Sequence, residues 1–212
     1  MAQLPPVIGT PGGSLAGAGR TFALSDEVAE IGRSGEVRTA RVLNGVARVG
    51  GPTVLHDLDI RWQKYHFNID HVVVSGRKVW ILDTKVWKAG VYWTLSGHTR
   101  RGLSSVPHTD KKTMEMAVNY LRGCLRNTGV QCQIQKPIII IWPGSDGAKC
   151  GVRFYRPVSA TAISAARFAT IAPRMFGRAP ADEAIVSRLA CLVSSAQSHT
   201  GRATGSYRSD DF

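Results

Sequence analysis

Two short apolar runs separated by a Gly-Arg pair constrain the fold of this chain more than any other feature. Residues 72–74 are three valines, and residues 79–82 read Val-Trp-Ile-Leu. β-Branched and bulky apolar residues in runs of this length are typical of strands. The Gly-Arg pair at residues 76–77 can form a two-residue hairpin loop, with Gly at the first position as a type II′ turn prefers. The sequence therefore predicts an antiparallel hairpin in which Ser75 pairs with Lys78.

That register places two carboxylates directly opposite each other. Asp70 precedes the first run and Asp83 follows the second. Directly opposed residues share one face of a sheet, with Cβ atoms about 4.5–5.5 Å apart. Lys85 lies two residues beyond Asp83 and therefore points to the same face. Two carboxylates this close repel each other unless a cation neutralises them, so the pattern indicates a site for a hard divalent ion such as Mg²⁺. The alternative is a solvated sheet edge with three idle charges.

These residues resemble a known family. An Asp at the start of one strand and Asp-x-Lys at the end of the next are similar to the PD-(D/E)xK nuclease superfamily. The string Asn-Ile-Asp-His at residues 68–71, followed by Asp-Thr-Lys at residues 83–85, resembles its nuclease-related domain (NERD) branch. Gly35-Glu36, upstream in a predicted helix, adds to a resemblance that runs from about residue 31 to residue 142.

The chain departs from the family pattern at two places. Asp83 stands where many relatives carry Glu. Relatives also carry a polar helix residue, often Gln, after the Asp-x-Lys strand, and the candidates for that position here are Glu115 and Asn119.

The resemblance, together with the alternation of helix and strand patterns, predicts an α/β fold. We expect a single restriction-endonuclease-like domain over residues 22–195, with a mixed central sheet of four or five strands flanked by helices. Residues 1–21 are rich in Gly and Pro and are predicted to form a flexible lead-in. Residues 196–212 are polar and are predicted to form a disordered tail.

The resemblance implies a metal-dependent nuclease with a defined set of site residues. Asp70 and Asp83, with the backbone carbonyl of Thr84, would bind Mg²⁺ or Mn²⁺. Lys85 would position the attacking water or offset developing charge. Glu36 would support metal binding or the lysine. From the residues alone, the preferred interpretation of Glu36 is a surface carboxylate that pairs with a neighbouring arginine, such as Arg33 or Arg38.

The charge of the chain fits a polyanionic partner. The sequence has 27 Lys and Arg against 15 Asp and Glu, a net charge of +12, which favours nucleic acid first and an anionic membrane second. Residues 97–112 are predicted to form a basic loop that contacts phosphates, or else an ordinary exposed loop. The proposed phosphate contacts are Arg100, Arg101, Lys111 and Lys112. We expect DNA rather than RNA as substrate, with little sequence preference.

Three aromatic residues beside this loop have two possible roles. Trp87, Tyr92 and Trp93 can stack on bases or pack in the core, and core packing is expected for at least two of them. The chain shows no apolar run long enough to span a membrane and no export signal, so we expect a cytoplasmic protein. The alternatives to a nuclease are a non-catalytic nucleic-acid-binding module on the same scaffold and a structural protein whose charge is incidental.

Overall fold

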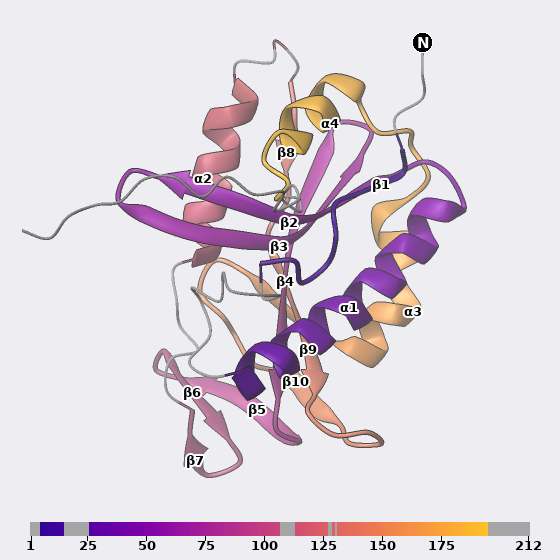
Figure 1. Ribbon diagram of the computed structural model, residues 1–212. Coiled ribbons are helices and arrows are strands. Elements are labelled where there is room, and N and C mark those ends of the chain that lie inside the picture. The colour runs from indigo at the N-terminus through magenta and orange to yellow at the C-terminus, as the bar shows by residue number, and fades with distance from the viewer. Residues whose placement is uncertain (1–4, 15–25, 107–112, 127–128, 130, 195–212) are drawn as a thin grey trace, which may run out of the picture.

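A computed structural model describes residues 5–14, 26–106, 113–126, 129 and 131–194 of the chain (Figure 1). Within these residues the chain forms helices and strands in mixed order, with one large sheet and one small sheet. None of the described helices is long and apolar enough to cross a membrane.

Seven strands of the described residues form one mixed sheet around β4. The spatial order is β1-β2-β3-β4-β9-β11, and β8 also pairs with β4. β2, β3 and β4 are antiparallel neighbours, whereas β9 runs parallel to β4 and β11 runs parallel to β9. The α/β prediction is confirmed, and the sheet has more strands than the four or five predicted. Its strands are β1 (Val7–Ile8), β2 (Thr53–Trp62), β3 (Tyr65–Ser75), β4 (Lys78–Trp87), β8 (Gln133–Ile134), β9 (Ile138–Pro143) and β11 (Thr161–Ser164).

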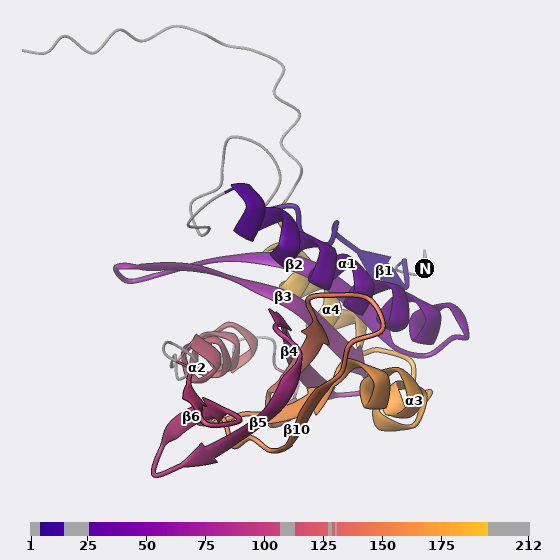
Figure 2. The ribbon, with the colours of Figure 1, turned by 90° about the horizontal axis from the view of Figure 1, so that it is seen from below.

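Helices cover both faces of this sheet (Figures 1 and 2). Apolar residues of α1 and α3 belong to one buried core, and those of α2 and α4 belong to another. β9 serves both cores, because Ile138 and Ile140 pack on the α1 side while Ile139 and Ile141 pack on the α2 side. A strand buried on both faces needs such an unbroken apolar run. The helices are α1 (Asp26–Arg48), α2 (Thr113–Arg126), α3 (Ala165–Phe176) and α4 (Glu183–Ala190).

A small sheet lies beyond the end of β4 (Figure 1). Its spatial order is β10-β5-β6-β7. The prediction of a basic loop over residues 97–112 is therefore wrong for its first part, because residues 98–101 and 104–105 are strands. Residues 107–112 lie outside the described residues. The strands are β5 (Gly90–Leu95), β6 (His98–Arg101), β7 (Ser104–Ser105) and β10 (Cys150–Phe154).

The predicted flexible lead-in contains an ordered segment. Val7 and Ile8 form β1, which pairs in parallel with β2, and the backbone N–H of Val54 donates to the carbonyl of Pro6 (2.9 Å). The prediction of flexibility is therefore wrong for residues 7–8. The open edge of β2 gives this segment hydrogen-bond partners that it could not find within itself. The domain boundaries at residues 22 and 195 stay a prediction.

Candidate active site

The hairpin of β3 and β4 has the predicted register. Ser75 pairs with Lys78, and the pairing continues without a shift to His71 and Leu82. Gly76 in the turn has a φ of 53°, a conformation that glycine adopts without strain. Extending the ladder by one residue sets Asp70 beside Asp83.

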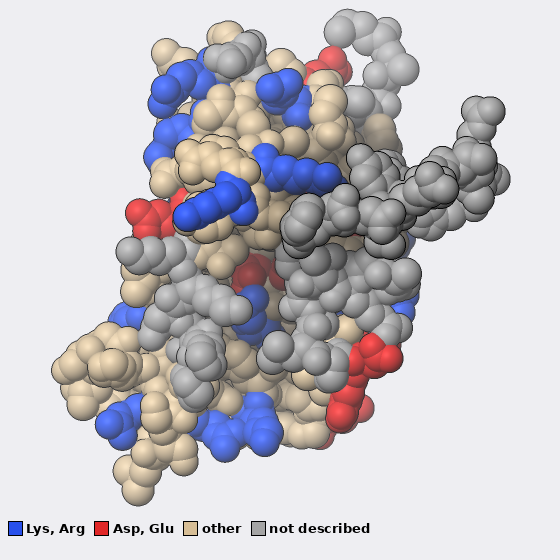
Figure 3. Space-filling model, turned by 60° about the vertical axis from the view of Figure 1, so that its left-hand side comes forward, with Lys and Arg blue, Asp and Glu red and all other residues tan. Residues whose placement is uncertain are grey.

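The three predicted site residues of the hairpin lie together. The backbone N–H of Thr84 donates to Asp70 Oδ2 (2.7 Å), and Lys85 Nζ donates to Asp83 Oδ1 (2.7 Å). Asp70 and Asp83 are buried, whereas the side chain of Lys85 is 48% exposed. The lysine therefore reaches from solvent to a pair of sequestered carboxylates. Figure 3 shows a hollow in the middle of one face, with acidic and basic side chains at its base and basic side chains above and below it.

Glu36 reaches the same cluster from α1. Gly35 lets the helix approach β4, because a Cβ at this position would lie 2.4 Å from Val86 Cγ2 and 3.2 Å from Thr84 Cγ2. Glu36 is 5% exposed, and the hypothesis of a surface pair with a neighbouring arginine is wrong. Burial raises the pKa of Glu36 to about 9, and the charges of Asp70 and Asp57 add to this shift.

The structure adds a fourth carboxylate that the sequence analysis missed. Asp57 is 1% exposed, and its neighbours His56 and Leu58 pair with the residues on either side of Asp70 in β3. Its Oδ2 accepts from the backbone N–H of Ser14 (2.7 Å), and its Oδ1 accepts from Asn68 Nδ2 (3.3 Å). The available signal was a charged residue in the middle of the strand pattern at residues 54–60, where burial needs compensation.

Asp57 also has an unusual backbone. Its φ of 56° is uncommon outside glycine, although Asp and Asn tolerate it better than other residues. The carbonyl of Asp57 accepts from the backbone N–H of Ser194 (2.9 Å). Asp57 therefore links Ser14 and Ser194, which lie near opposite ends of the described chain, to the edge of the carboxylate cluster.

The cluster carries more negative charge than its own cation can balance. Burial raises the pKa of Asp70 to about 7, and the nearby charge of Asp83 contributes to the rise. Desolvation opposes the charge of Lys85, but Asp83 and Asp70 outweigh it and its pKa is raised above the usual value. The amine is therefore an ammonium at neutral pH, facing several carboxylates.

Two buried carboxylate oxygens have no hydrogen-bond partner in the described structure, Glu36 Oε2 and Asp83 Oδ2. An unsatisfied buried oxygen of this kind is costly unless a proton or a cation meets it. The donors in the cluster are all oxygens, which suits Mg²⁺ and Mn²⁺ rather than softer metals. Among the described residues, no three His, Cys, Asp or Glu side chains are arranged to hold one ion by themselves.

A pair of histidines lies behind the cluster. His56 Nε2 donates to Asn44 Oδ1 (2.8 Å), so in the neutral ring Nδ1 of His56 accepts from Nδ1 of His71 (2.8 Å). Nε2 of His71 is then an acceptor facing the hydroxyl of Thr84 (3.4 Å). Burial lowers the pKa of His56 to about 4, and burial followed by the neighbouring ring lowers that of His71 well below its usual value. His71 is thus a packed neutral imidazole.

The other predicted residues lie on other elements or outside the described residues. Arg100 and Arg101 lie on β6, while Lys111 and Lys112 lie outside the described residues. Glu115 and Asn119 have exposed side chains on α2, and Asn119 accepts from Arg122 (3.2 Å).

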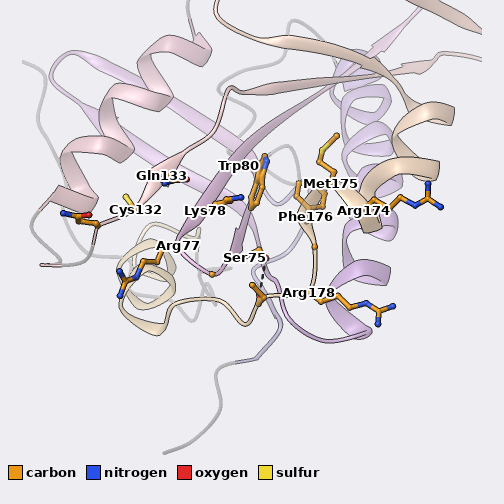
Figure 4. Close-up of a pocket in the computed structure, with 14 residues that line it drawn as sticks. Ser75, Arg77, Lys78, Trp80, Cys132, Gln133, Arg174, Met175, Phe176 and Arg178 are labelled. Carbon is orange, nitrogen blue, oxygen red and sulfur yellow. Dashed lines mark hydrogen bonds between the residues drawn. The ribbon is translucent and has the colours of Figure 1, made fainter.

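A large cavity lies away from the carboxylates. It has a volume of about 850 Å³ and lies around the β3–β4 turn, at the opposite end of the hairpin (Figure 4). Trp80 stands in its middle, and the side chains of Arg174 and Arg178 extend away from it. None of the residues that line this cavity belongs to the carboxylate cluster.

The fold and the cluster define a class of protein before any comparison is made: an α/β protein with an acidic site and a lysine on adjoining strands. Residues 31–141, more than half of the chain, match the profile of the nuclease-related domain (NERD) family. The chain belongs to this family. The matched segment includes Glu36, Asp57, Asp70, Asp83 and Lys85. No curated protein and no solved structure matches the chain.

Proposed function

We propose that this protein is a metal-dependent nuclease that hydrolyses DNA phosphodiester bonds with little sequence preference. The observation that carries the proposal is the buried cluster of Asp70, Asp83 and Glu36 with Lys85 beside it. Membership of a nuclease-related family supports the same activity. A structural surface patch would not place charged groups where desolvation raises the pKa of both Glu36 and Asp70.

Asp70, Asp83 and the backbone carbonyl of Thr84 would hold Mg²⁺ or Mn²⁺. The free Oδ2 of Asp83 is available to a cation, and waters would complete a coordination sphere that two carboxylates cannot fill. A bound ion of this kind supplies Lewis acidity at the phosphoryl group and lowers the pKa of an attacking water. The hydrogen bond from Thr84 N–H fixes the orientation of Asp70.

Lys85 acts through its charge. Its raised pKa keeps the amine protonated, so it is suited to offsetting charge on the phosphoryl oxygens or orienting a water, and unsuited to removing a proton. The contact with Asp83 Oδ1 holds the ammonium at the site. Glu36 borders the cluster from α1 and keeps a buried oxygen unsatisfied, which suits a supporting role next to a cation.

The substrate assignment rests on charge. The chain has a net charge of +12, and contacts between basic side chains and phosphates carry no base information. Arg100 and Arg101 on β6 are proposed as two of these contacts, as are Lys111 and Lys112. DNA is proposed over RNA.

The test is cleavage of linear and circular DNA with Mg²⁺ and with a chelator, comparing the wild type with Asp83→Ala. We expect cleavage only with the ion, and a loss of about 100-fold or more in Asp83→Ala. Asp59→Ala is the matched control, because Asp59 is also a strand carboxylate but pairs with Arg61 and His66 away from the cluster.

Two results would contradict the proposal. The first is cleavage by Asp83→Ala at the wild-type rate. The second is salt-dependent DNA binding with no cleavage under any divalent ion, which would favour the non-catalytic binding module. Circular DNA that is cut shows internal cleavage, and circular DNA that survives while linear DNA is degraded shows attack from ends.

A further inference from the structure

The small sheet has one face that is committed to the core. Tyr92 on β5 is 2% exposed, and its ring lies 4.5 Å from that of Trp87, which in turn lies 5.2 Å from that of Tyr155. The hydroxyl of Tyr92 donates to the carbonyl of Lys88 (2.6 Å). Two of the three aromatic residues considered for base stacking, Trp87 and Tyr92, are therefore packing residues, as expected.

The opposite face of the small sheet is exposed and apolar. Paired positions of neighbouring strands share a face, so one row of side chains crosses all four strands. Val91 and Leu95, two residues to either side of the row on β5, lie on the same face and are 59% and 55% exposed. Phe154 is 59% exposed. In order across the sheet, the row is Phe154, Trp93, Arg100 and Ser105.

The two aromatic rings in this row lie beside guanidinium groups, and the ring of Trp93 is also held by a hydrogen bond. Trp93 Nε1 donates to the carbonyl of Gly102 (2.9 Å), which fixes the ring against the sheet. The guanidinium of Arg100 lies 5.8 Å from the centre of the Trp93 ring. The guanidinium of Arg153 lies 5.7 Å from the centre of the Phe154 ring. We call the following residues the platform: Phe154, Trp93, Arg100 and Arg153, together with Val91 and Leu95.

The charge around the platform is of one sign. The four strands contain Arg100, Arg101 and Arg153 and no Asp or Glu. An exposed ring and a half-buried ring, each beside an arginine, match a partner that offers flat π faces and phosphates. Unpaired bases offer both, whereas the bases of a duplex are stacked on one another and inaccessible to a ring of the protein.

The platform is close to the active site along the chain. Lys85 on β4 and Gly90, the first residue of β5, are five residues apart, so their Cα atoms are separated by at most about 18 Å. The start of β5 is therefore within one short span of nucleic acid from the carboxylate cluster.

We propose that the platform binds unpaired bases by stacking, so that the substrate of this protein is nucleic acid with a single-stranded segment next to the scissile phosphate. This inference about the substrate rests on the proposed nuclease function. Binding itself is measurable without cleavage, and so the two proposals fail separately.

The test uses fluorescence anisotropy to measure the binding of a labelled oligothymidylate and of a labelled blunt duplex of equal length. Both are measured at low salt in the presence of a chelator. We expect the wild type to prefer the single strand. Phe154→Ala should weaken single-strand binding by about 5-fold or more, with less than about a 2-fold change for the duplex. Phe154 is largely exposed, so the variant should keep the wild-type circular dichroism spectrum and melting temperature.

Two further variants distinguish stacking from simple apolar contact and from a general effect of exposed aromatic rings. Phe154→Leu keeps an apolar side chain but lacks a π face, and we expect it to bind single strands almost as weakly as Phe154→Ala. Tyr65→Ala is the matched control, because Tyr65 is an exposed aromatic residue with Lys64 Nζ 5.6 Å from its ring centre, on the far ribbon of β2 and β3. It should bind as the wild type does.

Three outcomes would overturn the platform. One is unchanged single-strand binding in both Phe154→Ala and Trp93→Ala. Another is full binding by Phe154→Leu, which would show that apolar area rather than stacking matters. The last is a wild-type dimer in sedimentation that Phe154→Ala converts to monomers, which would make this face a contact between copies of the chain. None of these results would alter the dependence of cleavage on Asp83.

Discussion

Replacing Gly35 by alanine should damage this protein although alanine is the better helix former. Gly35 lies where α1 meets β4, and a Cβ there would come within 2.4 Å of Val86 Cγ2 and 3.2 Å of Thr84 Cγ2. Carbon atoms in contact are normally about 3.5–4.0 Å apart. The helix or the strand must therefore move by about 1 Å, and the strand segment that moves carries Asp83, Thr84 and Lys85.

The magnitude follows from two opposing effects. Alanine in place of glycine within a helix stabilises a protein by about 0.5–1 kcal/mol. Overpacking of a filled contact costs about 1–3 kcal/mol. Gly45→Ala shows the first effect alone, because Gly45 lies on the same helix and a Cβ there would meet no atom within 4 Å. The comparison of the two variants therefore isolates the cost of overpacking. The difference in unfolding free energy between the two variants should thus be about 1–3 kcal/mol, with Gly35→Ala the less stable.

Urea denaturation followed by circular dichroism measures this difference, and DNA cleavage by the two variants completes the comparison. Gly45→Ala should be slightly more stable than the wild type and fully active. Gly35→Ala should be less stable than Gly45→Ala and should lose activity even where it is fully folded. Equal stability of the two variants would refute the close approach of α1 to β4, and with it the reason why Glu36 reaches the cluster.

Substitutions at two other positions test the carboxylates. The folded-state pKa of Glu36, about 9, lies above its usual value, so the metal-free protein loses stability as pH rises from 4.5 towards 9. In a chelator, the unfolding free energy of Glu36→Gln should therefore rise relative to that of the wild type by up to about 1.4 kcal/mol per pH unit over that range. Thermal or urea melts in which this difference does not change with pH would contradict the buried position of Glu36. Asp57→Ala should lose about 2 kcal/mol or more, because it removes the acceptors of Ser14 and Asn68 and puts alanine at a positive φ. Asp57→Asn tolerates that φ and should lose clearly less in the same melts, so equal losses would exclude the backbone contribution.

The hairpin that carries the site was predictable because its information is local. A Gly-Arg pair between two apolar runs fixes the turn, and the turn fixes every pair up to His71 and Leu82. The Gly-Glu pair at residues 35–36 is likewise a local signal, because it consists of two adjacent residues in a predicted helix. These features required only neighbours in sequence, and the family resemblance pointed to the same residues.

The parts that were not predicted depend on distant segments. Asp57 reads as one polar residue in a strand, and its burial depends on Ser14 and Asn68, which lie 43 and 11 residues away. Residues 161–164 are Thr-Ala-Ile-Ser, and they form β11 by pairing with the open edge of β9. The small sheet pairs residues 150–154 with β5, a contact that no local pattern records.

Lys85 and the carboxylates beside it are proposed to perform phosphodiester cleavage. The most direct measurement of this role is the cleavage rate of Lys85→Ala with Mg²⁺ at saturating DNA, beside Lys78→Ala at the far end of the same strand. We predict that Lys85→Ala keeps its fold and binds DNA but cleaves at least about 100-fold more slowly, whereas Lys78→Ala cleaves normally. Cleavage by folded Lys85→Ala at the wild-type rate would contradict the proposed role of the lysine and its carboxylates.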